Sequence, residues 1–137
     1  MKVVISCSGK FHAFALAEQL ERHGVLHKFY TSYSSIKNPF AKHLVSRRDN
    51  ELIPGFKITT FLPTAFGLKL AKKSWFWNEI FDKWVAYKIS RIKADVFIGW
   101  SGMSLRSITA AKKKGMVTIL ERGSSHIEFQ NKILKEE

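Results

Sequence analysis

Three short polar stretches follow apolar stretches of the sequence and contain the side chains best suited to chemistry. The last of them, ERGSSH at 121–126, combines a carboxylate, a guanidinium, two hydroxyls and an imidazole. Arg122 can hold a carboxylate or phosphate through two parallel hydrogen bonds, and His126 can act as acid, base or hydrogen-bond donor. Charge directly after a buried strand is costly unless it is partnered. The stretch predicts either a polar ligand or an internal ion pair, Glu121–Arg122 or a similar one, with a serine capping the next helix.

The first polar stretch, SGKFH at 8–12, joins an apolar run to a helical pattern. A glycine turn that opens a helix offers backbone N–H groups and a favourable dipole to a phosphate. Gly9 permits that turn, Lys10 adds positive charge, and His12 can face the same cleft. The G-x-G-x-x-G and P-loop fingerprints are both absent. A simple strand-to-helix connection is therefore the alternative to a phosphate site.

The middle stretch, WSG at 100–102, also follows an apolar run. In the functional interpretation, Ser101 and Gly102 shape a ligand crevice. In the structural alternative, Trp100 belongs to the core and Ser101 caps the following helix.

Other common reaction centres find no support in the spacing of the residues. A lone Cys7 inside an apolar run is typical of a core residue rather than a thiol nucleophile paired with His12. The histidines show no H-E-x-x-H pattern, one cysteine gives no zinc-site spacing, and no G-x-S-x-G elbow occurs. The sequence predicts neither a metal nor an organic cofactor.

The elements that must position these loops follow from hydrophobic periodicity. Helical patterns alternate with short β-branched or apolar runs, which is typical of a parallel sheet with helices on both faces. We therefore predict one Rossmann-like α/β domain, in which the three polar stretches meet at the carboxyl ends of the strands. The predicted strands span 3–7, 27–31, 56–62, 96–100 and 116–120, and the predicted helices span 11–23, 40–45, 66–93 with a break near Ser74, 103–114 and 127–137.

The net charge of +12 predicts attraction to an anionic partner. Residues 64–93 are its most concentrated source, with seven basic and two acidic residues, a net +5, among seven aromatic ones. Such a segment suits an anionic membrane surface, and the alternative is a helix packed on the sheet with a solvated basic face. No nucleic-acid-binding module is recognisable. No membrane-spanning run and no signal peptide are visible, which favours a cytoplasmic protein, peripheral at the inner membrane face.

Two stretches, ADVFIGWSGMSLRSITAAKKKGMVTILERGSSHI and EFQNKILKEE, together with the first strand–helix–strand unit, resemble the N-terminal domain of family 4 (group 1) glycosyltransferases of GT-B architecture. The resemblance implies two Rossmann-like domains, of which the N-terminal one binds the acceptor and the other binds a nucleotide-sugar donor. It implies retaining transfer without a metal, to a glycan or lipid-linked acceptor, as in polysaccharide biosynthesis. The residues expected to contact substrate are Gly9, Lys10, His12, Ser101, Gly102, Arg122, Ser124 and His126.

The sequence departs from this family in two respects. Many relatives have a histidine directly after the fifth strand, where this chain has Glu121. The paired glutamates of the donor domain have no counterpart, because Glu128 and Glu136 share their spacing without the accompanying glycine. We therefore expect residues 1–137 to be a partial, truncated acceptor domain that is inactive without a donor domain. The alternative is a non-catalytic module that binds phosphate or nucleotide, or pairs with a separate subunit.

Overall fold

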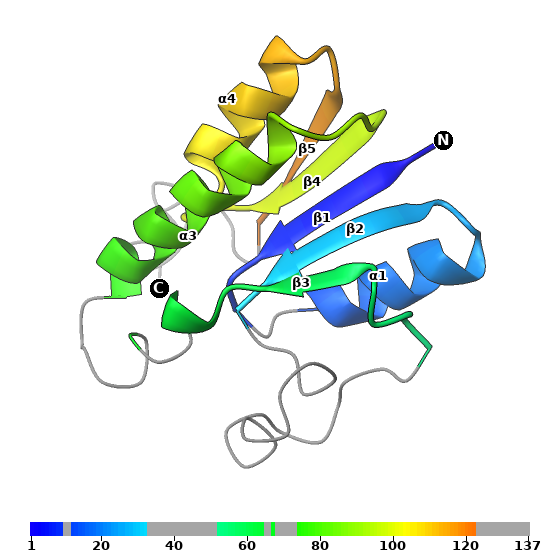
Figure 1. The fold of residues 1–137 in the computed structure, drawn as a ribbon, viewed down its shortest axis with the longest axis horizontal. Coiled ribbons are helices and arrows are strands. Elements are labelled where there is room, and N and C mark those ends of the chain that lie inside the picture. Colours follow the sequence, from blue (N-terminus) through cyan, green and yellow to red (C-terminus); the bar gives the residue numbers. More distant parts are fainter. Residues whose placement is uncertain (10–11, 33–51, 65–66, 68–73, 123–137) are drawn as a thin grey trace, which may run out of the picture.

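A five-stranded parallel sheet forms the centre of the protein in the computed structural model (Figure 1). The structure describes residues 1–9, 12–32, 52–64, 67 and 74–122. The strand order is β3-β2-β1-β4-β5. The predicted Rossmann-like α/β class is therefore confirmed. In chain order the elements are β1 (Val3–Cys7), α1 (Ala13–Arg22), β2 (Leu26–Thr31), β3 (Ile58–Thr60), α3 (Ser74–Ile89), β4 (Val96–Trp100), α4 (Leu105–Lys113) and β5 (Val117–Glu121).

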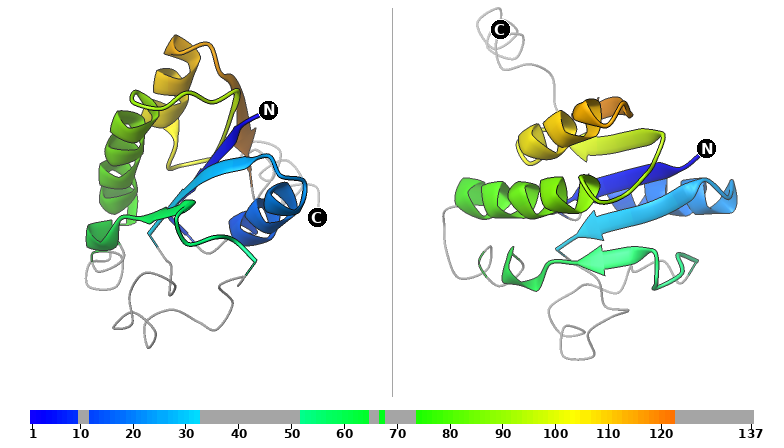
Figure 2. Two further views of the ribbon diagram at one scale, coloured as in Figure 1. Left: turned by 45° about the vertical axis from the view of Figure 1, so that its right-hand side comes forward. Right: turned by 45° about the horizontal axis from the view of Figure 1, so that its top comes forward.

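Helices cover both faces of the sheet, as predicted (Figure 2). Successive side chains of a strand point to opposite faces, and β1 is buried on both. Val3, Ile5 and Cys7 pack on the side of α1, whereas Val4 packs with residues of α3 and α4. This double burial explains why Val3, Val4 and Ile5 are apolar in succession rather than alternating with polar residues.

The predicted boundaries are accurate for β1 and β4, whereas β2 begins one residue earlier than predicted, β5 is shifted by one residue, and α1 and α4 are shorter. The expectation that the fifth strand is buried is wrong, because Val117, Ile119 and Leu120 are exposed.

The strand predicted at 56–62 contracts to Ile58–Thr60, because residues 55–57 form a turn in which Lys57 N–H donates to the Pro54 carbonyl over 2.9 Å. The long helix predicted at 66–93 is described as α3 from Ser74 onward, and residues 68–73, on the other side of the predicted break, lie outside the described residues. The helices predicted at 40–45 and 127–137 lie outside the described residues.

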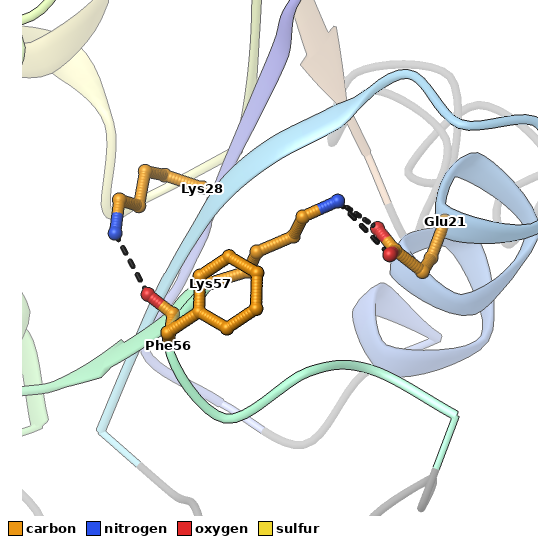
Figure 3. A network of polar contacts seen from close by, with 4 residues as sticks. All are labelled: Glu21, Lys28, Phe56 and Lys57. Carbon is orange, nitrogen blue, oxygen red and sulfur yellow. Dashed lines mark hydrogen bonds and ion pairs between the residues drawn. The ribbon is translucent and has the colours of Figure 1, made fainter.

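Two lysines connect the turn before β3 to α1 and β2 (Figure 3). Lys57 donates to both carboxylate oxygens of Glu21 on α1, over 2.6 and 2.9 Å. Lys28 of β2 donates to the Phe56 carbonyl over 2.7 Å. The Lys57–Glu21 pair is largely buried, so it holds β3 against α1 in spite of the short length of the strand.

A buried carboxylate joins α3 to α4. Asp82 is 4% exposed and accepts hydrogen bonds from Arg106 N–H (2.6 Å), Ser107 N–H (2.9 Å) and the Ser107 hydroxyl (2.6 Å). The two N–H groups are backbone donors that the first turn of a helix leaves unpaired. Asp82 therefore caps α4 from a neighbouring helix. Ser104, at the capping position, makes no side-chain cap hydrogen bond.

We expect Asp82→Ala to lower the free energy of unfolding by about 2–3 kcal/mol, because two backbone N–H groups and a hydroxyl lose a charged acceptor. Urea unfolding followed by circular dichroism measures the change. Lys83→Ala is the control at the adjacent, exposed position and should cost about 0.5 kcal/mol or less. Equal losses in the two variants would contradict the capping role.

Candidate functional site

The polar loops lie at the point in the sheet where the strand order changes direction, next to β1. β1 is flanked by β2 on one side and by β4 on the other. The carboxyl ends of the strands at such a switch point are where open α/β sheets bind ligands. The loops after β1, β4 and β5 all lie at this end, which we call the carboxyl edge. It contains the described parts of all three polar stretches.

On the α1 side of the carboxyl edge, an imidazole meets a carboxylate. His12 Nε2 lies 3.7 Å from Glu121 Oε2, with the side chains 57% and 37% exposed. His12 stands immediately before α1, and Glu121 ends β5 in register with Trp100. The backbone N–H of Ser101 donates to the Glu121 carbonyl over 2.9 Å. The pair is solvent-accessible, and its two groups can bind a hydroxyl as donor and acceptor.

Trp100 forms the base of this cluster. Its ring packs edge-on against His12, with 5.5 Å between ring centroids, and the residue is 2% exposed. The interpretation of Trp100 as a core residue is therefore confirmed. Within the part of the chain that the structure describes, its buried Nε1–H has no hydrogen-bond partner. Buried polar groups normally have one, so this donor is an exception within the core.

A second polar cluster lies on the α3 side of the carboxyl edge. The Ser8 hydroxyl, after β1, donates to Asn78 Oδ1 over 2.7 Å, and Ser8 N–H approaches the Met103 sulfur at 3.2 Å. Beside them is a hollow of about 330 Å³, which we call the α3–α4 hollow. It is lined by Trp75, Asn78, Glu79, Asp82 and 102–106.

Glu79 is the exposed carboxylate of this hollow. Its pKa is lowered by hydrogen bonds from Arg106 and Lys83, and the Arg106 guanidinium lies 3.1 Å away. A glutamate carboxyl is ionised at neutral pH, and these hydrogen bonds favour the charged form further. The hollow therefore presents an ionised carboxylate beside a guanidinium.

Two glycines shape the loop between the clusters. A Cβ at Gly99 would lie 2.5 Å from the Ser104 hydroxyl oxygen, which accepts a hydrogen bond from Trp100 N–H over 3.0 Å. Gly102 has a φ of +82°, a conformation that side chains disfavour. Glycine at both positions lets the chain turn sharply from β4 towards α4.

The structure brings together the described residues expected to contact substrate. Gly9, His12, Ser101, Gly102 and Arg122 all follow strands at the carboxyl edge, with Ser101 and Arg122 exposed. The alternative in which Ser101 caps the helix is wrong, because α4 begins at Leu105 and takes its cap from Asp82. The remaining expected contacts, Lys10, Ser124 and His126, lie outside the described residues.

Sequence reasoning missed the partner of His12 and the contribution of α3. Among the residues that the structure describes, Glu121 pairs with His12 and not with Arg122, so an internal pair of the expected kind is present with a different partner. The prediction for 66–93 considered only the basic and aromatic residues of that helix, and so it gave Asn78 and Glu79 no role. Asn78 and Glu79 follow Trp75 by three and four residues, a spacing that places all three on one face of a helix. This spacing is the signal that could have grouped them.

Within the described ranges, no group of three or more metal-ligating side chains occurs. Comparison with known proteins finds no matching family model, no matching curated protein and no matching solved structure. The chemistry of the site therefore rests on the geometry of its own residues.

We expect Cys7 to resist alkylation in the native protein. Burial raises the pKa of its thiol to about 12, and only the thiolate is a strong nucleophile. Iodoacetamide at pH 8 should leave the folded chain unmodified and add one adduct in urea, because Cys7 is the sole cysteine; mass spectrometry counts the adducts. Rapid alkylation of the folded chain would contradict this and revive Cys7 as a nucleophile.

Proposed function

We propose that this protein is the acceptor-binding side of a glycosyltransferase that moves a sugar from a nucleotide-sugar donor to a glycan or lipid-linked acceptor. The observation that carries the proposal is the His12–Glu121 pair, 3.7 Å apart and solvent-accessible at the carboxyl edge. The resemblance of the sequence to acceptor domains of GT-B enzymes supplies the reaction class. A Rossmann-like fold by itself supports many functions.

In this proposal, His12 and Glu121 hold the acceptor hydroxyl. A hydroxyl group is both a donor and an acceptor of hydrogen bonds, so it can donate to the carboxylate and accept from the imidazole N–H. The buried Trp100 ring limits the movement of His12 from one side. Fixing the hydroxyl in this way orients it towards a donor bound opposite the carboxyl edge and lowers the entropic cost of transfer.

The donor is bound by a second, nucleotide-sugar-binding unit. We therefore expect the isolated 137 residues to turn over none of the common UDP- and GDP-sugars. Co-expression with the polypeptide encoded directly downstream should give transfer, measured as radiolabelled sugar entering a lipid or glycan extract. Turnover by the isolated chain would contradict the acceptor-side assignment, and tight nucleotide binding without any transfer would favour a non-catalytic module.

In the reconstituted enzyme, His12→Gln and Glu121→Gln should each lower kcat/KM for the acceptor about 10–100-fold, because each removes one hydrogen bond to the reacting hydroxyl. The KM for the donor should not change. His23→Gln is the matched control, since His23 is also exposed but caps the opposite end of α1. Equal losses in His12→Gln and His23→Gln would contradict the site.

We also propose that α3 touches an anionic membrane surface, which would bring a lipid-linked acceptor to the carboxyl edge. The helix packs on the sheet through Phe81, Val85 and Ile89, and Phe76 and Tyr87 remain exposed. Arg91 lies over the Tyr87 ring, 4.0 Å from its centroid. No described helix is long and apolar enough to cross a bilayer. Exposed aromatic rings beside basic groups suit the interfacial region.

Vesicles that contain phosphatidylserine should bind the protein at low salt and release it at high salt. Arg91→Gln should weaken binding about fivefold, the effect of one basic residue near the surface. Arg22→Gln makes the same substitution on α1, on the opposite face of the sheet, and should change binding less. Co-sedimentation measures both. Failure to bind at low salt, or equal effects of the two variants, would contradict the membrane surface.

A further inference from the structure

The α3–α4 hollow is separate from the His12–Glu121 pair but opens at the same carboxyl edge. Gly102 and Met103 line it from the loop after β4, and Asn78 lines it from α3. The Ser8–Asn78 hydrogen bond ties its α3 wall to the end of β1. Its volume of about 330 Å³ is at the lower end of the range of about 300–1,000 Å³ usual for ligand pockets. A single ring suits that size better than an extended chain.

An exposed tryptophan forms one wall of the hollow. Trp75 is 64% exposed, although indole rings usually contribute their large apolar area to cores or interfaces. It lies near the end of α3 from which the helix is described, away from Phe81, Val85 and Ile89, which pack against the sheet. An exposed indole face binds flat apolar surfaces, and the C–H face of a sugar ring is one.

The other wall supplies hydrogen-bonding groups of both kinds. Asn78 uses Oδ1 to accept from Ser8, and its NH2 group has no acceptor among the described residues. Within the described ranges, the Arg106 guanidinium donates one hydrogen bond, to Glu79, and a guanidinium has five N–H donors. The Glu79 carboxylate can accept from hydroxyls. Sugar hydroxyls need donors and acceptors side by side, and this wall offers both.

The negative charges of the hollow disfavour the binding of a phosphate. Two carboxylates, Glu79 and Asp82, line it together with one guanidinium, Arg106. The Asp82 carboxylate already occupies the first backbone N–H groups of α4, which would otherwise attract an anion. Like charges within a site repel. A neutral polyhydroxylated ligand avoids this repulsion.

We infer that the α3–α4 hollow binds a neutral sugar ring, stacked on Trp75 and hydrogen-bonded by Asn78, Glu79 and Arg106. That this ring belongs to the glycosyl acceptor rests on the proposed function; the sugar site itself does not. The acceptor would then be held at two places on the carboxyl edge, with its reacting hydroxyl at His12 and Glu121.

Saturation-transfer difference NMR tests the site on the full chain, with the methyl glycosides of glucose, galactose, mannose and N-acetylglucosamine as probes. At least one should receive saturation at its ring C–H groups. Trp75→Ala should abolish this transfer, and Glu79→Gln should weaken binding about tenfold. Tyr87→Ala is the matched control, because Tyr87 is an exposed aromatic of α3 outside the hollow, and it should keep the full signal. Inorganic phosphate should not displace the sugar.

Three outcomes would overturn the inference: no transfer to any probe, an undiminished signal in Trp75→Ala, or displacement by phosphate. Trp75 is exposed, so its replacement leaves the core intact, and an unchanged melting temperature checks this. The inference and the proposed function fail separately. Sugar binding that depends on Trp75 without any glycosyl transfer would refute only the function. Transfer without such binding would refute only the sugar site.

Discussion

The hydrogen bonds from the start of α4 to the buried Asp82 carboxylate are the interaction on which the described site depends. They fix α4 against α3, and so they fix the loop that precedes α4. That loop contains Gly102 and Met103, which line the hollow, and it follows Trp100, which supports His12. Asp82 therefore caps the start of α4 and also sets the distance between the two walls of the α3–α4 hollow.

Close packing in the loop after β4 adds a second constraint. Ser104 turns its hydroxyl inward to Trp100 N–H and cannot cap its own helix, which is why the cap has to come from Asp82. The inward hydroxyl needs the space that Gly99 leaves. Gly99, Ser104 and Asp82 therefore depend on one another. Because Gly99 has no side chain, the Ser104 hydroxyl can turn inward. The first N–H groups of α4 then lack a cap from Ser104 and need the carboxylate of Asp82.

Sequence periodicity predicted the class of fold and most elements, because a strand buried on both faces leaves a continuous apolar run and a helix leaves a spaced one. It also predicted that the loops after β1, β4 and β5 would meet, since parallel strands end at one edge. It could not predict that His12 would meet Glu121 or that Asp82 would reach α4. Those contacts depend on strand order, register and helix position, and local patterns encode none of them.

The distribution of charge separates long-range attraction from local recognition. The chain carries +12, yet acidic and basic groups are mixed in the described part of the carboxyl edge: Glu121 faces His12, and Glu79 faces Arg106. A group of exposed basic residues also lies around the end of α3 and the last turn of α4, where Lys114 donates to the Ser90 carbonyl. A surface potential acts over about a Debye length, whereas hydrogen bonds act only on contact. In the proposed function, the basic surface would hold the protein near an anionic layer, while the hydrogen-bonding groups of the carboxyl edge would select a neutral, hydroxyl-rich ligand.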